Sequence, residues 1–385
     1  MIKIWKIFAL IFILTFQSSC EEKDKITDVE LISFCEKLET SIINRDPTLF
    51  NNSLFEAGLQ KRVFEGYHAG GGLSYALNHT LNNYYKLGDR ILSTVMHGDF
   101  IFEVTRVYRD DDENPWAVFR LFNGVSFNYI EFQFEKILNQ IRITEGYYYN
   151  TGQELSETIR DLVFMEVGFD GKGKNDPNIK KYYHQGIEFM VKAQKEMLLQ
   201  NYQNALDSFE MMDQRLMQHP FFFVQKINIL GHLNEDELFK NIEVFDNAFP
   251  NEERFNILNA VQLQMYKGEV EATRKAIHFL SKHVGNDAVL DYYEANALLN
   301  NGDYDKAIFY CDKFIEQRPG LIFGYSAKTI AFIQKKDYES ATNNLSKIIR
   351  NFNTSVADLE DAFQDFPEFF SSEEYELWKK GLSKI

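Results

Sequence analysis

The chain has 385 residues and a mass of 45.1 kDa, which at roughly 150 residues per domain predicts two or three domains. It is 45% hydrophobic and 15% aromatic with only 7 prolines, so a disordered, collagenous or low-complexity chain is excluded. Its 41 Lys and Arg against 57 Asp and Glu give a formal net charge of −16, and no basic patch interrupts this acidic balance. Nucleic acid is therefore not expected as a partner. Three cysteines cannot form a disulfide framework.

Residues 1–19 have the pattern of a secretory signal. Two lysines precede the apolar stretch Ile7–Phe16, which is too short to cross a bilayer about 30 Å thick. The following Ser18-Ser19-Cys20 resembles the cleavage site of bacterial lipoproteins, although Gln17 stands where their commonest motif has an aliphatic residue. The resemblance implies that Cys20 is lipidated after cleavage, which leaves 39 basic against 57 acidic residues and a net charge of −18. The alternative is an ordinary signal peptide with a chance cysteine.

A charged tether, residues 20–25, follows the signal. Its segment Glu21–Lys25 resembles the acidic stretches that direct some Bacteroidota lipoproteins to the cell surface. The signal and the tether together predict a lipid-anchored protein of the bacterial cell envelope. We expect it in the outer membrane, on the periplasmic or the surface face.

Residues 26–169 are predicted to form an α+β domain in which helices come first. Apolar residues recur at helical spacing from Val29 to Ile42, with Asp28 as the expected N-cap. The period then drops to two, most clearly where Ile130, Phe132 and Phe134 alternate with polar residues. Further helices are expected around residues 47–55, 74–85 and 155–167, and strands at 100–109, 117–122, 130–134 and 141–143.

This order of elements resembles a cystatin-like or nuclear transport factor 2-like cone, a curved antiparallel sheet wrapped on helices. Some enzymes of that fold hold an acid or base inside the cone, so Glu103, Glu131 and Glu145 on the predicted strands are candidates for that role. No pairing between them is visible in the sequence, and a structural role for each is the alternative.

Beyond a polar linker at residues 170–180, the chain repeats itself. The turn Gly302-Asp303-Tyr304 has a partner in Lys336-Asp337-Tyr338, and 34 residues separate the two tyrosines. The best copy is residues 288–321, in which small alanines occupy the contacts between two helices and a proline ends the unit. This period and pattern resemble the tetratricopeptide repeat.

The resemblance implies that residues 181–355 form an all-α solenoid of about five stacked helix pairs. Such an array buries a continuous core only by stacking, and its last unit needs a cap. Residues 356–385 are expected to supply capping helices, with Trp378 as an anchor.

The 34-residue period also predicts a binding groove, because in tetratricopeptide arrays the first helices of the units line the concave face. One recurring position is an amide row: Gln194, Asn228, Gln262 and Asn296. Seven residues earlier is an apolar row: Ile187, Phe221, Phe255, Val289 and Phe323. Seven residues is nearly two helical turns, so both rows share one face. The amides are expected to bond a partner's main chain and the apolar row to take its side chains. The alternative is that the amides bond between neighbouring helices.

No pattern predicts catalytic residues, a metal site or a cofactor. Zinc-protease, CxxC, P-loop and calcium-loop motifs are absent, and the 8 histidines show no ligand spacing. Cys35 and Cys311 lie on apolar helix faces and are expected to be buried thiols. Gly70-Gly71-Gly72 after His68 superficially resembles an esterase oxyanion loop, but no buried strand precedes it. The acidic run Asp110–Glu113 is expected to be a solvated hairpin tip, with cation binding as the alternative.

The sequence therefore predicts a membrane-anchored, non-catalytic adaptor that binds a protein or peptide segment in the concave groove. One alternative is a ligand-binding or enzymatic pocket in the α+β domain, with the array as a dimerisation or docking arm. Another is a nutrient-capturing surface lipoprotein, since glycan binders of Bacteroidota also carry such repeats. Those chains have aromatic platforms inserted between repeats, and no such insertion is seen here.

Overall fold

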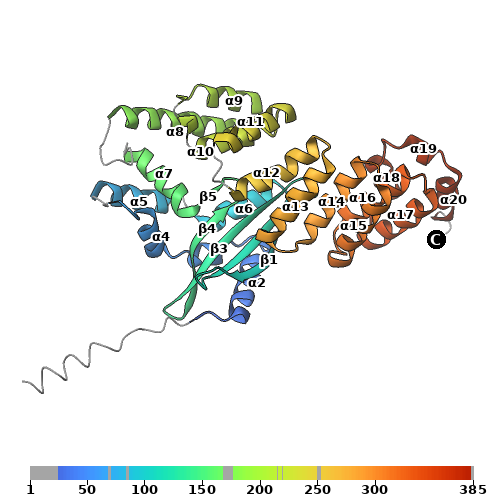
Figure 1. The fold of residues 1–385 in the computed structure, drawn as a ribbon, viewed down its shortest axis with the longest axis horizontal. Coiled ribbons are helices and arrows are strands. Elements are labelled where there is room, and N and C mark those ends of the chain that lie inside the picture. The colour runs from blue at the N-terminus through green and yellow to red at the C-terminus, as the bar shows by residue number, and fades with distance from the viewer. Residues whose placement is uncertain are drawn as a thin grey trace, which may run out of the picture.

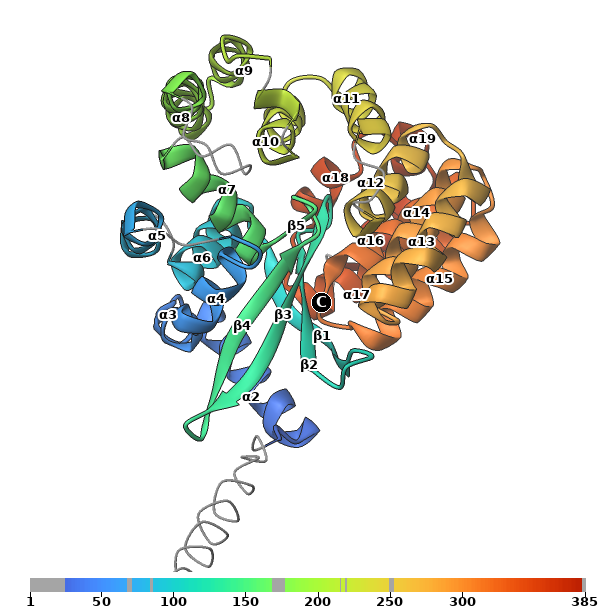
Figure 2. The same cartoon turned by 60° about the vertical axis from the view of Figure 1, so that its left-hand side comes forward.

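An antiparallel sheet lies between two groups of helices in the computed structural model (Figures 1 and 2). The structure describes residues 25–67, 71–83, 86–167, 177–214, 216–218, 220–248 and 253–382. The predicted signal, the lipidation residue Cys20, most of the tether and most of the linker at 170–180 lie outside these residues.

Five helices precede the sheet: α2 (Asp28–Ile43), α3 (Thr48–Ser53), α4 (Glu56–Val63), α5 (Gly71–Asn83) and α6 (Leu87–His97). The N-cap of α2 is Thr27 and not the expected Asp28, because the Thr27 hydroxyl accepts from the Glu30 amide while the Glu30 carboxylate accepts from the Thr27 amide. This reciprocal capping box satisfies two amides that helix geometry leaves without partners. The sequence pattern does not predict α4 or α6.

The sheet is a meander in which each strand pairs with the next along the chain. Its strands are β1 (Ile101–Arg109), β2 (Pro115–Phe122), β3 (Phe127–Ile137), β4 (Gln140–Tyr148) and the short β5 (Gln153–Glu154). Helix α7 (Leu155–Val167) follows directly. The α+β class predicted for this part of the chain is confirmed, with helices first and antiparallel strands after them.

One face of the sheet packs on the N-terminal helices through aromatic side chains. The ring of Phe50 from α3 lies 6.0 Å from Phe102 and Phe119 and 5.8 Å from Phe132, and Phe102 stacks on Phe119 at 5.1 Å. All four rings are buried. Each ring removes a large apolar area from water, so this layer forms a continuous core.

A long run of paired helices follows, as predicted for an all-α solenoid. The pairs are α8 (Pro177–Leu198) with α9 (Tyr202–Glu210), α10 (Pro220–Leu230) with α11 (Glu235–Ala248), α12 (Glu253–Tyr266) with α13 (Val270–Val284), α14 (Ala288–Asn300) with α15 (Tyr304–Gln317), and α16 (Ile322–Gln334) with α17 (Tyr338–Phe352). A 3₁₀ turn, η1 (Leu216–Gln218), lies between the first two pairs.

The 34-residue period is visible in the backbone of this array. Residues with a left-handed φ recur just before the second helix of a pair, at Gln200 (φ 59°), Gly268 (70°), Gly302 (80°) and Lys336 (62°). Adjacent members from Gly268 onward are 34 residues apart, and Gln200 lies twice that distance before Gly268. The same sharp turn therefore connects the two helices in several units.

Short helices cover the end of the array: α18 (Val356–Ala362), α19 (Pro367–Phe370) and α20 (Glu373–Leu382). Buried Phe369 and Tyr375 from this segment pack with Leu345 and Ile348 of α17. The Trp378 indole N–H donates to the Ser346 hydroxyl at 2.7 Å. These contacts bury an apolar face that the last helix pair leaves without a neighbour.

The second face of the sheet packs on the middle of the array, so the two parts of the chain share a core. Buried Val118 and Tyr129 of the strands, and Tyr149 just after β4, lie in one cluster with Leu258 of α12 and Val289 of α14. Figure 2 shows the strands between the blue helices α2–α6 and the gold and orange helices α12–α17. The sheet is therefore covered on both faces.

Candidate functional site

The amide row divides into an open and a covered part. Gln194 on α8 and Asn228 on α10 are exposed, whereas Gln262 on α12 and Asn296 on α14 are half-buried. Asn296 is hydrogen-bonded to the side chain of Tyr292 on its own helix. Only the first two members have exposed side chains, so α8 and α10 are where the predicted contact of this row with a partner stays possible.

The apolar row is mostly buried. Phe255 is 1% exposed and its ring lies 4.2 Å from that of Phe245, and Val289 is fully buried. Phe323 packs on Phe122 of β2 at 5.2 Å, and Ile187 is partly buried against the cluster around α8 and α9. The side chain of Phe221, on α10, lies outside what the structure describes. Partner binding at these residues remains a prediction, but Phe255 and Val289 present no exposed side chain to a partner here.

The chain's own sheet covers the first helices of the later units. The Tyr292 hydroxyl donates to the Gly124 carbonyl at 3.0 Å, and the Tyr293 hydroxyl donates to the Val125 carbonyl at 2.9 Å. Gly124 lies in the β2–β3 turn with φ 88°, and a Cβ there would stand 2.2 Å from Phe323. Glycine is required at this turn both by the backbone conformation and by the close approach of α16.

A buried ion pair joins the sheet to the array. Arg120 of β2 is fully buried, and its guanidinium donates to Asp287, just before α14, and to Glu103 of β1. The Tyr129 hydroxyl donates to the other Asp287 oxygen at 2.8 Å. Buried charges are tolerated only when paired and hydrogen-bonded in this way. The sequence signal was Arg120 itself, the single charge inside the apolar run Trp116–Phe122, but its partners could not be read from the sequence.

A second polar cluster surrounds Glu131 of β3, whose side chain is 1% exposed. Its carboxylate accepts from the hydroxyls of Tyr149 at 2.6 Å and Tyr108 at 3.1 Å, and from Arg254 of α12 at 2.8 Å. Burial, and then the nearby Glu131 charge, raise the pKa of Tyr149. The Arg254 guanidinium also lies over the Tyr147 ring at 4.6 Å. All of these groups act together to hold α12 against the sheet.

The three strand glutamates therefore have structural partners. Glu103 and Glu131 belong to the two clusters between sheet and array. One oxygen of the buried Glu145 accepts from the amides of Gly146 and Ser156, each at 3.0 Å, and burial raises the pKa of this carboxyl. This bond ties β4 to the start of α7. The alternative that the sequence left open, a structural role for each, fits these contacts.

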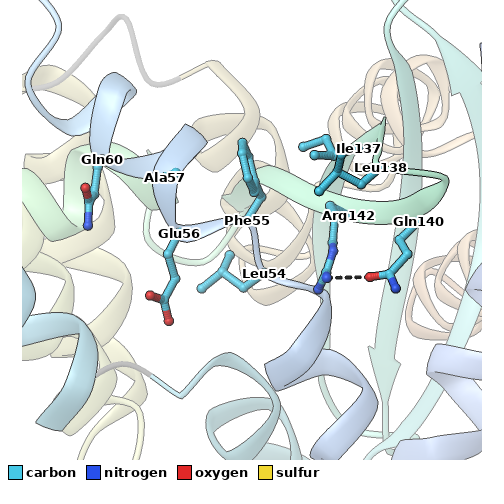
Figure 3. Close-up of a pocket in the computed structure, with 9 residues that line it drawn as sticks. All are labelled: Leu54, Phe55, Glu56, Ala57, Gln60, Ile137, Leu138, Gln140 and Arg142. Carbon is cyan, nitrogen blue, oxygen red and sulfur yellow. Dashed lines mark hydrogen bonds between the residues drawn. The ribbon is translucent and has the colours of Figure 1, made fainter. Parts of the chain in front are cut away.

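The rings of Phe50, Phe102, Phe119 and Phe132 pack together on the face of the sheet that the N-terminal helices cover. A depression of about 650 Å³ lies away from this layer, between the start of α4 and the β3–β4 hairpin. Figure 3 shows Phe55, Ile137 and Leu138 beside it, with Arg142 bonded to Gln140. Its exposed lining is largely apolar, and its polar members are Glu56, Gln60, Gln140 and Arg142.

The other candidate residues have ordinary surroundings. Cys35 and Cys311 are buried, and burial raises the pKa of each thiol, that of Cys311 to about 12. Asp110 organises the β1–β2 turn, since its carboxylate accepts from the Asn114 amide at 2.8 Å and the Trp116 indole at 2.9 Å. Gly71 and Gly72 begin α5, while His68 and Gly70 lie outside the described residues.

Within the part of the chain that the structure describes, no group of three or more His, Cys, Asp and Glu is placed to hold a metal ion. No described helix combines the length and the apolar character needed to cross a membrane.

Comparison with known proteins gives little to set beside this geometry. The sequence matches no protein-family model, and no curated protein matches it. A solved structure titled "MamA RS-1 ArsTM double mutant" is similar to part of the chain. It shares 14% sequence identity, with a TM-score of 0.38 over 45% of this chain and 98% of that chain. A TM-score this low does not define a common fold.

Proposed function

We propose that the protein is a membrane-anchored, non-catalytic adaptor whose tetratricopeptide-type array binds a protein or peptide segment. The observation that carries this proposal is the open pair of amides, Gln194 and Asn228, 34 residues apart on the successive first helices α8 and α10. Amide side chains both donate and accept, which suits them to bond the main chain of a bound segment without reading its sequence.

Two further features support this assignment. The later units cannot offer the same surface, since strands β2–β4 already pack on α12 and α14. The buried thiols and the hydrogen-bonded strand glutamates have structural surroundings, which favours an interaction role over catalysis.

The anchor is the second part of the proposal. Cys20 after the apolar signal is the residue that would carry the lipid, and the outer membrane of the cell envelope is the proposed location. Several acyl chains at about 0.8 kcal/mol per buried CH₂ hold a protein that its charged tether would not. Labelled palmitate should enter the wild type and not Cys20→Ser, and Cys20→Ser should leave the membrane fraction.

The groove is tested by site-specific photocrosslinking in the native host. A photoreactive residue placed at Gln194 or at Asn228 should crosslink the same partner. The control position is Asn343, which is also an exposed amide residue but lies on α17, the second helix of its pair. The double variant Gln194→Ala/Asn228→Ala should keep the wild-type melting temperature and lose capture of that partner. Equal crosslinking at all three positions, or unchanged capture by the double variant, would refute the groove.

A further inference from the structure

The end of the molecule where the described chain begins carries exposed aliphatic side chains that the fold does not use. Leu138 at the tip of the β3–β4 hairpin is 94% exposed, Val29 in the first turn of α2 is 78% exposed, and Ile32 one turn later is 44% exposed. Figure 2 shows this hairpin tip and the start of α2 at the same end of the molecule, beyond the sheet.

Besides being exposed, Leu138 has a backbone conformation that is unfavourable for leucine. The pairing of Ile137 with Gln140 leaves Leu138 and Asn139 as a two-residue turn, with φ 50° and 59°. Such turns favour asparagine, aspartate and glycine, and a leucine in the left-handed region costs about 1–2 kcal/mol. An exposed, strained leucine contributes nothing to this fold, which points to an apolar surface outside the chain.

Specific contacts fix the hairpin beside the start of the chain. Lys136 of β3 pairs with Glu30 of α2 at 3.2 Å, and Arg109 at the end of β1 donates to the Ile26 carbonyl at 2.6 Å. The proposed lipidation residue, Cys20, lies six residues before Ile26. An extended chain spans at most about 3.6 Å per residue, so the anchor lies within about 22 Å of this end. A lipid surface is thus within reach of the aliphatic side chains.

We propose that this end of the protein, Val29, Ile32 and Leu138, is a second membrane contact in which the hairpin tip enters the interface of the bilayer. The inference rests on the proposed lipid anchor and says which face of the protein the anchor presents to the lipid. The apolar residues Leu54, Phe55 and Ile137 beside the tip extend the contact (Figure 3).

The charges around this end select the kind of lipid. Asp28 and the turn residues Asp110–Glu113 lie close to the start of the chain, because Arg109 bonds both Asp28 and the Glu113 carbonyl. Together with Glu30 they carry six negative charges, against four positive charges on Lys25, Arg109, Lys136 and Arg142, and this excess disfavours anionic headgroups. The contact is therefore with a zwitterionic surface such as phosphatidylethanolamine, driven by apolar burial.

The test uses the acylated, full-length protein reconstituted into vesicles of phosphatidylethanolamine and phosphatidylcholine. Leu138→Cys is labelled with an environment-sensitive fluorophore, since Cys20 is acylated and Cys35 and Cys311 are buried. The matched control is Val125→Cys, an 86% exposed aliphatic residue in the β2–β3 turn at the other end of the same strands. Nitroxide lipids should quench the probe at 138 several-fold more than the probe at 125. Replacing half of the neutral lipid by phosphatidylglycerol should reduce that quenching.

A second variant separates membrane contact from stability. Leu138→Asn places a favoured residue in the turn, so the melting temperature should be unchanged or raised. In the same variant, a fluorophore attached at Val29→Cys should lose its quenching by nitroxide lipids. Equal quenching at positions 138 and 125 in acylated protein would overturn the inference and leave the anchor intact. Shielding of the 138 probe without vesicles, rising with protein concentration, would overturn it in favour of a second copy of the chain. Absence of acylation at Cys20 would instead remove the proposed anchor.

Discussion

The ion pair between Arg120 and Asp287 offers the sharpest test of how sheet and array are joined. The change is Arg120→Met, which keeps the volume of the side chain and removes its charge. Asp287, 1% exposed, would then be a buried carboxylate without its cation. Breaking a buried pair from one side costs about 3–5 kcal/mol, whereas an exposed pair contributes at most about 1 kcal/mol.

The contacts place the expected value near the lower limit. Asp287 keeps the Tyr129 hydroxyl at 2.8 Å and the Val289 amide at 3.3 Å, which continue to solvate its charge. Glu103, the other partner of Arg120, is 25% exposed and can turn to water. We therefore expect Arg120→Met to lower the free energy of unfolding by about 3 kcal/mol. The double variant Arg120→Met/Asp287→Asn should be more stable than Arg120→Met, because it no longer buries an unpaired charge.

The assay is urea unfolding followed by tryptophan fluorescence in two single-tryptophan backgrounds. Trp116 lies in β2 and Trp378 in α20, so one reports the sheet and the other the capped end of the array. A shared core requires that Arg120→Met move both transitions. A loss below about 1 kcal/mol, or a shift of the Trp116 transition alone, would refute the reasoning that this pair is buried and joins the two parts.

Three further predictions follow from single elements. Gly268 has φ 70° and no atom within 4 Å of an added Cβ, so Gly268→Ala should cost about 1 kcal/mol in thermal unfolding from backbone strain alone, while Lys336→Gly (φ 62°) should gain a similar amount. Burial, and then the nearby Glu243 charge, raise the pKa of Asp246 from 3.8 to about 6, so the free energy of unfolding falls as the pH rises between these values. Asp246→Asn should therefore raise the free energy of unfolding at pH 7 by on the order of 1 kcal/mol, after allowance for solvent screening, and should have no effect below pH 3.8. A fragment of residues 178–385 should be helical by circular dichroism but should bind hydrophobic dyes or self-associate, because loss of the sheet uncovers Leu258 and Val289. A monomeric fragment that binds no dye would contradict the shared core.

Local patterns were sufficient for most of the fold. Alternation at Ile130, Phe132 and Phe134 identifies β3 because strand side chains point to opposite faces with a period of two. The period of 34 residues reflects a backbone turn that recurs at Gly302 and Lys336. Helices α4 and α6 were missed, since α4 has only 8 residues and neither helix has a side-chain N-cap.

The site was harder to predict, because it depends on contacts between distant segments. Nothing near Phe323 in the sequence indicates that Gly124 and Phe122 will cover it. Both faces of β3 are buried, and polar Glu131 and Tyr129 point to the array, where they resemble solvent-facing residues of a half-buried strand. The 34-residue spacing gives the positions of a groove but not whether the chain fills it.

The proposed anchor and the position of the exposed amides together imply an orientation of the protein on the membrane. The aliphatic end with Val29 and Leu138 lies beyond one end of the sheet, and helices α8–α10 lie toward the other, above β5 and α7 in Figure 2. If the lipid surface takes the first end, helices α8 and α10, which carry Gln194 and Asn228, lie at the end away from it. Arg254 and Asp287 tie α12 and the start of α14 to the sheet through Glu131 and Arg120, so these helices cannot leave the sheet without breaking both ion pairs. In this arrangement the sheet separates the proposed membrane contact from α8 and α10, so a segment bound there would be held clear of the membrane.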